Sequence, residues 1–484
     1  MRLLARAGRN LIFKSLGEMF AIISFLVLFI IAARLLGAGD YGRYNYAASL
    51  CALALIFMDL GLNTLFVRDA ARRRDLLGAY GGTILILKIG LGLGVMAGLA
   101  LFLGLGSASR GELLLVLAVA LVQVLWHLAE VGIAGLNAVE RMDQEALLKT
   151  ASRVAALALT GGFLFLGWGL WGLVAGLGLA NGLAAGLALG LLRRHGPLQA
   201  RLRADFLGPL LRESVPMAVT SVFIMIYSRV DMVLLQAMGR SYAEIGWYAA
   251  AVRVNDGVGI IPALVCRALL PVFAGLAGKD PQGLARLYEQ GLRLLLLLGL
   301  PAAVGLIALR QEVALTVFGP DYAPTAPVFL WYGPLLALVF LNSLQLNVLI
   351  ALGLQRLAAL VTGICLLANV ALDLWWIPAH GYMGAAAATF FTELTLLIAG
   401  SIFLRVNGGL KLPYYLVSRP ALATAVMAAG LYLTQGLGLF VNLVSAMIVY
   451  AGAVLALRAV AWAEVRSLFQ FIKAGGLTPG RDVV

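Results

Sequence analysis

The sequence predicts an all-α integral membrane protein with fourteen transmembrane helices, organised as two six-helix bundles related by a parallel repeat plus two C-terminal helices. Three observations lead to this prediction. Apolar residues fill 62% of the 484 positions and charged residues 12%, whereas a soluble domain averages about 45–50% and about 25%. The apolar residues form stretches of about 20, the length that crosses a hydrocarbon core of about 30 Å. Short motifs of the first half of the chain also recur in the second half.

The apolar stretches are rich in Leu, Ala, Gly and Val and lack the strict alternation of barrel strands, so each is expected to be a helix. The first stretch is too long for the core of a signal peptide, and no small-residue cleavage site follows it, so no cleaved leader is expected. The predicted spans are 12–34, 43–67, 80–104, 113–137, 150–168, 170–192, 213–237, 245–270, 287–308, 327–350, 357–377, 382–404, 416–436 and 439–462.

Basic residues in the predicted loops set the orientation. If the N-terminus lies inside, five of the 36 Lys and Arg residues fall outside, three lie within spans, and the remaining 28 fall on the inner side. Lys and Arg are enriched in cytoplasmic loops of membrane proteins. Both termini are therefore expected in the cytoplasm. The net charge of +13 reflects this asymmetry, and nucleic acid is not expected as a partner.

The repeat rests on three matches in the same order along both halves. Gly42-x-Tyr44-x-x-Ala47 matches Gly246-x-Tyr248-x-x-Ala251, "GLNAVERMDQEALL" (135–148) is echoed by "IALGLQRLAALV" (350–361), and "GLWGLVAG" (169–176) by "GYMGAAAA" (381–388). Both halves begin inside, so the repeat is parallel, and transporters of this kind bind substrate between their repeats. The expected divisions are 1–192 for an N-terminal lobe, 193–212 for a basic linker, 213–405 for a C-terminal lobe, and 406–484 for helices 13–14 and the tail.

Four charged residues lie well inside the predicted seventh and eighth spans: Arg229, Asp231, Arg253 and Asp256. The two arginines lie about 18 Å along their helices from the intervening turn. A charge facing lipid at the helix centre costs roughly 2.5–3.5 kcal/mol. The four residues therefore either form Arg229–Asp231 or Asp231–Arg253 bridges that only fix the hairpin, or line a solvated cavity. We favour the cavity and assign Arg229 and Arg253 to anion binding; Arg253 and Asp256 share a helix face.

A second set of charges lies nearer the cytoplasm. Glu18 and Asp59 should reach similar depth, and Lys88 and Glu130 another common level, where a bridge between them is the simplest interpretation. Buried carboxylates without a partner can carry protons or bind cations. We therefore assign Glu18, Asp59, Asp231, Asp256, Lys88 and Glu130 to ion coupling or pairing. Glu393 is a further candidate, and Asp373 is expected at the membrane interface.

Nothing in the sequence indicates enzymatic chemistry, a cofactor or a metal. The three cysteines fall in separate spans and the three histidines are scattered. The Gly-rich runs 88–98 and 172–190 have GxxxG spacings that predict close helix packing. They do not resemble phosphate loops, because no strand precedes them.

Four elements resemble the polysaccharide-exporter flippases, the O-antigen and exopolysaccharide branch of the multidrug/oligosaccharidyl-lipid/polysaccharide exporter superfamily. They are "ARLLGAGDYGRY" (33–44), "DLGLNTLFVRDAA" (59–71), "FGPDYAPTAPVF" (318–329) and "HGYMGAAAATF" (380–390). The resemblance implies two bundles around a cleft, alternating access, a bacterial cytoplasmic membrane, and an undecaprenyl-diphosphate-linked oligosaccharide as substrate. It further suggests a polysaccharide polymerase and glycosyltransferases as partners. The assignment of Arg229 and Arg253 to the cleft rests on their positions in the spans and not on the resemblance. We expect a monomer.

Other functions stay open at this point. Within the superfamily, the alternatives are a lipid II flippase or a cation-coupled multidrug exporter, although a typical drug exporter has twelve spans. A membrane polysaccharide polymerase or glycosyltransferase is less favoured, because such an enzyme should carry a large outer loop or a cytosolic catalytic domain. Coupling of transport to an H⁺ or Na⁺ gradient is a hypothesis that the buried carboxylates suggest.

Overall fold

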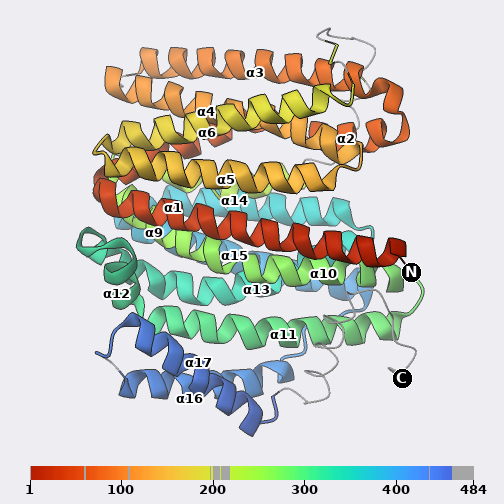
Figure 1. The fold of residues 1–484 in the computed structure, drawn as a ribbon. Helices are drawn as coiled ribbons and strands as arrows, with labels where there is room; N and C mark the ends of the chain where they lie inside the picture. The colour runs from red at the N-terminus through yellow and green to blue at the C-terminus, as the bar shows by residue number, and fades with distance from the viewer. Residues whose placement is uncertain are drawn as a thin grey trace. The chain divides into compact units, whose positions relative to one another are not determined.

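The computed structural model describes residues 2–58, 61–106, 109–196, 198–199, 208, 219–434 and 436–459, and the side chains among them from residue 23 onward. Within these ranges the regular structure is entirely helical, as predicted. The principal helices are α1 (Arg2–Ala54), α2 (Leu62–Arg72), α3 (Leu77–Leu105), α4 (Arg110–Ala138), α5 (Met142–Phe165), α6 (Gly169–Arg193), α8 (Val230–Ala237), α9 (Tyr242–Val258), α10 (Ile260–Leu276), α11 (Pro281–Ala308), α12 (Arg310–Val313), α13 (Phe329–Ala351), α14 (Gln355–His380), α15 (Tyr382–Gly408), α16 (Tyr415–Leu433) and α17 (Leu439–Ala456) (Figure 1).

Over the described residues, twelve helical segments are long and apolar enough to cross a membrane, or thirteen if the bent pair Val219–Tyr227 and Val230–Ala237 is one span. The segment Ile23–Arg72 counts once, although 50 residues of straight helix would extend about 75 Å. Its backbone leaves helical geometry at Gly37, where φ is 71° and ψ is 171°. The protein is thus a multi-pass membrane protein, and the count of fourteen stays a prediction.

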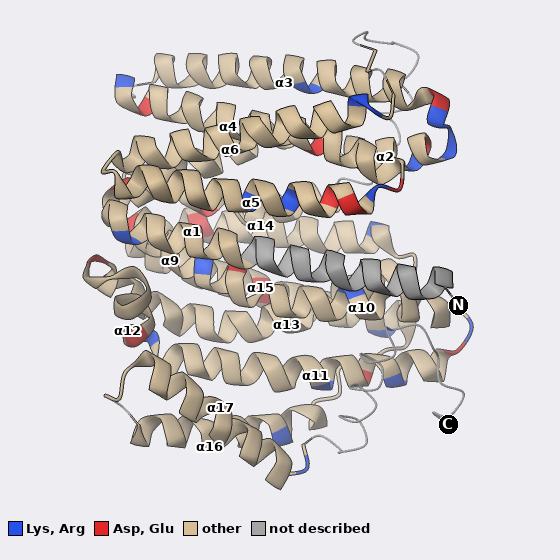
Figure 2. Ribbon diagram, in the orientation of Figure 1, with Lys and Arg blue, Asp and Glu red and all other residues tan. Residues whose placement is uncertain are grey.

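Charged residues gather toward helix ends and connecting segments, and long stretches of helix between them carry none (Figure 2). The boundary that was hardest to predict, near residues 167–172, is confirmed: α5 ends at Phe165 and α6 begins at Gly169. Gly169 has a φ of 57°, a left-handed conformation that is open to glycine without steric strain.

The chain divides into two compact units. The first comprises the described residues of Met1–Leu36 and Tyr46–Val222, and the second comprises Gly37–Asn45 and the described residues of Phe223–Val460. In the first unit α4 and α5 both pack along α6, and α3 packs on α4; in the second, α13 and α14 both pack along α15, and α11 packs on α13. The same three-helix arrangement therefore occurs in both halves of the chain, as the repeat predicts.

The turns around these helices repeat as well. Gly169 before α6 corresponds to Gly381 before α15, with φ of 57° and 56°. Glu140 after α4 corresponds to Gly353 after α13, with φ of 63° and 75°. Matching left-handed residues at matching helix ends show that the two halves share backbone turns as well as sequence motifs.

The two glycines that first indicated the repeat, Gly42 and Gly246, lie in one helix contact inside the second unit. A Cβ on Gly42 would overlap the carbonyl of Tyr242 and lie 2.8 Å from the Gly246 nitrogen, and a Cβ on Gly246 would overlap the carbonyl of Ala38. The absence of side chains at these positions lets α1 and α9 approach backbone to backbone.

The Gly-rich runs have mixed roles. In the run 172–190, a Cβ on Gly176 would strike the backbone of Thr160, so close packing of α5 on α6 is confirmed there. In the run 88–98, Gly92 lies against Val124, but Gly90, Gly94 and Gly98 have open space where a side chain would be. The prediction of close packing therefore holds at Gly92 and does not hold for the other three glycines of the run 88–98.

Candidate substrate and ion sites

Charged side chains inside the described spans form three groups, one in the first unit and two in the second. In the first unit, Glu130 of α4 accepts hydrogen bonds from Trp126 Nε1 at 3.1 Å and from His127 Nδ1 at 3.2 Å. Lys88 of α3 is fully buried and attracts Glu130 electrostatically. The predicted pair thus lies within electrostatic range, and His127 belongs to the same group.

Arg153 of α5 adds a further cation to this group. Its Cζ lies 4.5 Å from the ring centroid of Phe25 and 4.7 Å from that of Trp126, and it is attracted to Glu130. Aromatic faces stabilise a guanidinium when water is excluded. Among the side chains that the structure describes, Lys88, His127 and Arg153 are therefore all attracted to Glu130. We refer to these four residues as the basic cluster, an arrangement suited to holding an anion.

The second group is centred on Arg253 of α9. Its side chain is only 13% exposed, and Nη1 lies 3.8 Å from Oδ2 of Asp256, whose side chain is 46% exposed. The prediction that these two residues share a helix face is confirmed. Tyr41 and Tyr44 from α1 also lie within electrostatic range of the guanidinium. Arg253 thus lies among two tyrosines of α1 and the carboxylate of Asp256.

Arg229 lies immediately before α8 and is half-buried. Across the described residues its side chain makes no ion pair within 4.0 Å, although it attracts Asp231 electrostatically. Asp231 instead accepts hydrogen bonds from the hydroxyl of Tyr248 and, at 2.7 Å, from the backbone nitrogen of Met232. The Arg229–Asp231 bridge that would only fix the hairpin is thus not formed.

The third group is acidic and involves α8, α14 and α15. Asp373 of α14 is fully buried inside the protein and within electrostatic range of Asp231; its expected location at the membrane interface stays a prediction. Asn369, one helical turn earlier, donates its amide to Asp373 Oδ2 at 3.3 Å and to the carbonyl of Tyr227 at 3.2 Å. Across the described residues, Oδ1 of Asp373 is buried without a hydrogen-bond partner, an arrangement that costs free energy.

Glu393 of α15 lies beside the same side chains. It accepts from Asn342 Nδ2 at 2.6 Å and from the Tyr227 hydroxyl at 3.4 Å. The Tyr248 hydroxyl lies 3.2 Å from Thr389 Oγ1, one turn before Glu393. We refer to Asp231, Asp373 and Glu393 as the acidic cluster. Within the described residues, its hydrogen-bond donors are the neutral side chains of Tyr227, Tyr248, Asn342 and Asn369 and the backbone of Met232.

Sequence reasoning missed the roles of Asp373, Asn369, Asn342, Thr389 and the two tyrosines. A signal was present, because Asn369 and Asp373, and likewise Thr389 and Glu393, are spaced four apart in otherwise apolar spans and so share a helix face. Glu18 and Asp59 lie outside the residues whose side chains the structure describes. Within the described part of the chain, no group of three or more His, Cys, Asp or Glu residues could hold a metal ion.

The fold and these groups define a multi-pass helical membrane protein built from a repeat, with polar side chains buried inside both units. The family described as "Polysaccharide biosynthesis protein" matches residues 7–277, more than half of the chain. The protein belongs to this family. Its predicted relation to the polysaccharide-exporter flippases is confirmed.

Relatives and solved structures agree with this assignment. The chain is 23% identical over 437 residues to the "Probable low-salt glycan biosynthesis flippase Agl15" of Haloferax volcanii, covering 86% of this chain and 89% of that protein. It has the fold of "Lipid II flippase MurJ, inward closed conformation", with a TM-score of 0.77, 17% identity, and coverage of 92% and 99%. An inward-facing multidrug resistance MATE family transporter of the MOP superfamily matches with a TM-score of 0.68, 15% identity, and coverage of 83% and 98%.

Proposed function

We propose that this protein is a flippase that moves undecaprenyl-diphosphate-linked oligosaccharide from the inner to the outer leaflet of a bacterial cytoplasmic membrane by alternating access. The product would supply O-antigen or exopolysaccharide assembly. Membership of the polysaccharide biosynthesis family and similarity to a glycan flippase support this proposal. The relatives are named as flippases or transporters, which accords with a protein that is not an enzyme.

The observation that carries the proposal is the presence of arginine side chains deep in apolar helices. Arg153 lies over the rings of Phe25 and Trp126 and is attracted to Glu130, and Arg253 lies 3.8 Å from the partly exposed carboxylate of Asp256. A diphosphate is complementary to such side chains in charge and accepts bidentate hydrogen bonds from guanidinium groups. We therefore keep Arg253 and Arg229 as substrate-binding residues, and Arg153 of the first unit is a separate candidate.

The membrane potential favours the proposed direction of transport. Moving one negative charge outward from a negative cytoplasm gains about 2.3 kcal/mol per 100 mV. A headgroup with two charges would gain about 4–5 kcal/mol over the same potential. A net anionic substrate can thus be exported without a nucleotide.

We further propose that a cation, H⁺ or Na⁺, couples to this transport, and that H⁺ is the ion at the acidic cluster, whose described carboxyl groups are not arranged to hold a metal ion. The support is the unpartnered Oδ1 of Asp373 beside Asp231. Two carboxylates at this depth exclude each other's charge unless a proton or a cation joins them. Asp231 was a coupling candidate from the sequence, and Asp373 now joins it; Glu18, Asp59 and Asp256 stay candidates for the same role.

The remaining parts of the proposal concern partners and orientation. The substrate's chemistry implies glycosyltransferases that build the lipid-linked unit and a polymerase that consumes it on the other side. We propose that the protein works as a monomer. We also propose that both termini lie in the cytoplasm, because the basic residues of the predicted loops lie mostly on one side.

The test is lipid flipping in proteoliposomes that contain the purified full-length protein. A fluorescent undecaprenyl-diphosphate oligosaccharide should cross the bilayer in minutes with the wild type, and Arg253→Ala should slow this at least tenfold. Arg405→Ala removes an exposed arginine outside all three groups and serves as the matched control. Normal flipping by Arg253→Ala would remove Arg253 from the site.

The same vesicles separate the alternatives. Flipping of lipid II at an equal or higher rate would favour a lipid II flippase, and efflux of cationic dyes without lipid flipping would favour a drug exporter. For coupling, an imposed proton or sodium gradient should accelerate the wild type, and this acceleration should be lost in Asp373→Asn. An unchanged gradient response in that variant would exclude the proposed ion site.

A further inference from the structure

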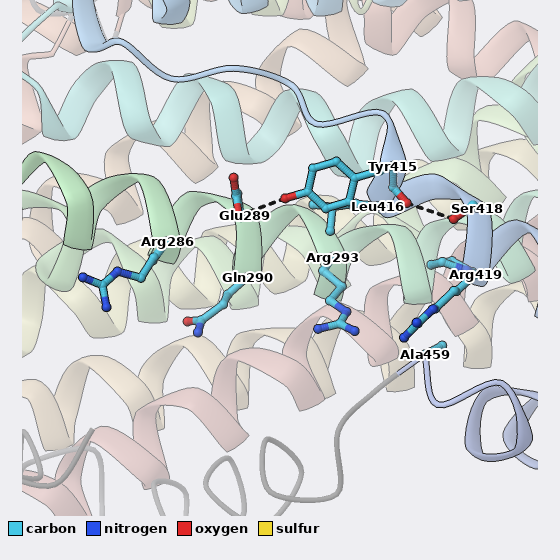
Figure 3. Close-up of a pocket in the computed structure, with 10 residues that line it drawn as sticks. Arg286, Glu289, Gln290, Arg293, Tyr415, Leu416, Ser418, Arg419 and Ala459 are labelled. Atoms are coloured by element: carbon cyan, nitrogen blue, oxygen red, sulfur yellow. Dashed lines mark hydrogen bonds between the residues drawn. The ribbon is translucent and has the colours of Figure 1, made fainter. Parts of the chain in front are cut away.

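A cavity of about 560 Å³ lies in the second unit between α11 and the beginning of α16. It takes no part in the sites described above. Ten residues line it: Arg286, Glu289, Gln290, Arg293, Tyr415, Leu416, Ser418, Arg419, Pro420 and Ala459. Figure 3 shows Arg286, Gln290 and Arg293 in a row along α11, with Arg419 of α16 beyond them. Residues spaced by four and seven along a helix share one face, which explains this row.

The lining is basic. Three arginines and one glutamate face the cavity, so positive charge exceeds negative by two. Glu289 accepts a hydrogen bond from the Tyr415 hydroxyl at 3.2 Å. One nitrogen of Arg419 donates to the carbonyl of Arg458 at 3.0 Å, which holds the guanidinium in place and leaves other donors of its five for a ligand.

The cavity also lies at a boundary between charged and uncharged helix. After Arg293, residues 294–308 of α11 carry no charge, and after Arg419, residues 420–433 of α16 carry none. On both helices the arginines are thus the last charges before a membrane-spanning stretch. Such residues mark the level of the lipid headgroups.

Exposed apolar side chains adjoin the same opening. Tyr414 is 87% exposed, Tyr415 59% and Val417 38%. Tyrosines at this level are typical of the membrane interface, where the ring contacts lipid and the hydroxyl contacts water. A free phosphate ion would need only the arginines, whereas an anionic lipid uses the charged cavity and the apolar rim together.

We propose that this cavity, the α11–α16 pocket, binds the phosphate headgroup of an anionic membrane phospholipid such as phosphatidylglycerol or cardiolipin. Basic pockets between transmembrane helices on the cytoplasmic side bind such headgroups, and the sequence predicts this end of α11 to be cytoplasmic. Guanidinium groups of Arg286, Arg293 and Arg419 contact the phosphate oxygens. The acyl chains lie along the exposed apolar surface of α16.

A bound headgroup would strengthen the join between α16 and α11 at this end, where the hydrogen bond from Tyr415 to Glu289 already links them. At the other end the two helices are already held by the apolar cluster of Leu309, Met427, Leu431 and Ala446, and the Tyr450 hydroxyl of α17 donates to the carbonyl of Leu297 at 2.6 Å. The lipid is thus a second attachment point for α16 and α17, the two helices that follow the repeat. This role is independent of the substrate proposed above.

The experiment measures lipid binding by the purified full-length protein in detergent, with phosphatidylglycerol titrated in and thermal unfolding and native mass spectrometry as readouts. Phosphatidylglycerol should raise the midpoint of unfolding and phosphatidylcholine should not. The double variant Arg293→Ala/Arg419→Ala should weaken apparent affinity at least tenfold. Arg293→Lys/Arg419→Lys should retain part of it, which keeps the test valid if the alanine variant folds poorly.

Controls distinguish this pocket from general attraction to a basic protein. Arg405→Ala should bind phosphatidylglycerol like the wild type, and Glu289→Gln should bind it at least as tightly, because that change removes the pocket's one negative charge. Equal affinity in the wild type and both double variants would overturn the proposal, as would equal weakening by Arg405→Ala.

Two further arms identify the source of the phosphate. Inorganic phosphate, added at constant total ionic strength, should fail to displace the lipid. Displacement would show a site for the free ion. An undecaprenyl phosphate that binds here in preference to phosphatidylglycerol would assign the pocket to the carrier lipid. Either result would overturn the phospholipid assignment.

Discussion

The basic cluster of the first unit and the acidic cluster of the second bury charge in opposite ways. In the basic cluster, Lys88 and Arg153 attract the single carboxylate of Glu130, and aromatic rings cover the guanidinium. In the acidic cluster, Asp231, Asp373 and Glu393 receive hydrogen bonds from neutral tyrosine and asparagine side chains. The first group gathers cationic side chains around a carboxylate, and the second gathers carboxyl groups among neutral hydrogen-bond donors.

The difference shows how far the two halves have diverged on one scaffold. The packing of three helices and the left-handed turns are the same in both halves. At the offset that relates "GLWGLVAG" to "GYMGAAAA", Glu393 corresponds to Asn181, whose amide donates to the carbonyl of Val122 at 3.0 Å. An asparagine that binds the backbone in the first half thus corresponds to a glutamate in the second half. The repeated backbone arrangement is common to both halves, whereas the polar side chains on it differ in charge.

The largest effect should come from removing the most buried cation. Lys88→Met removes a positive charge that attracts Glu130. Removing one partner of a buried ion pair typically destabilises a protein by about 3–5 kcal/mol. Unfolding of the purified protein, followed by thermal or denaturant titration, measures this loss. Lys411→Met at an exposed position is the control. A variant as stable as the wild type would show that Lys88 has no such role.

An intermediate effect should follow from filling the contact between the two motif copies. Gly246→Ala places a methyl group against the carbonyl of Ala38, and overpacking of this kind costs about 1–3 kcal/mol. Gly39→Ala is the matched control on the neighbouring helix, since its added methyl group would have open space. If both variants unfold at the same denaturant concentration, the contact between α1 and α9 is looser than the structure shows.

The smallest effect should be the most informative, because its sign differs between the clusters. Glu130→Gln removes a carboxylate that attracts Lys88 and Arg153 and should destabilise by about 1–2 kcal/mol, whereas Asp373→Asn removes an acid beside another acid and should be neutral or stabilise by about 1 kcal/mol. Both changes keep the side-chain size. Parallel unfolding curves give the comparison, and shifts of the same sign in both variants would contradict the opposite character of the clusters.

Much of the candidate site could be predicted from sequence, because a charged residue within an apolar span is recognisable without knowing which way its helix face points. Arg253, Asp256, Asp231, Lys88 and Glu130 were identified in this way. The burial of Asp373 was not predicted, because it depends on the packing of α14 against α8. Asn369 and Tyr227 were overlooked because uncharged polar residues are common in spans and give a weak signal individually.

The amino-acid sequence by itself determined that the chain lies in a membrane, roughly where its helices begin and end, and that its halves are related. These properties follow from local composition, since about 20 consecutive apolar residues must form a helix when no water can satisfy the backbone. Only the tertiary structure decided which polar side chains meet. The helices are apolar on nearly every side, so no amphipathic stripe reveals which face turns inward. Asp231 and Asp373 come together because helices distant in sequence pack and set the rotation of each about its axis.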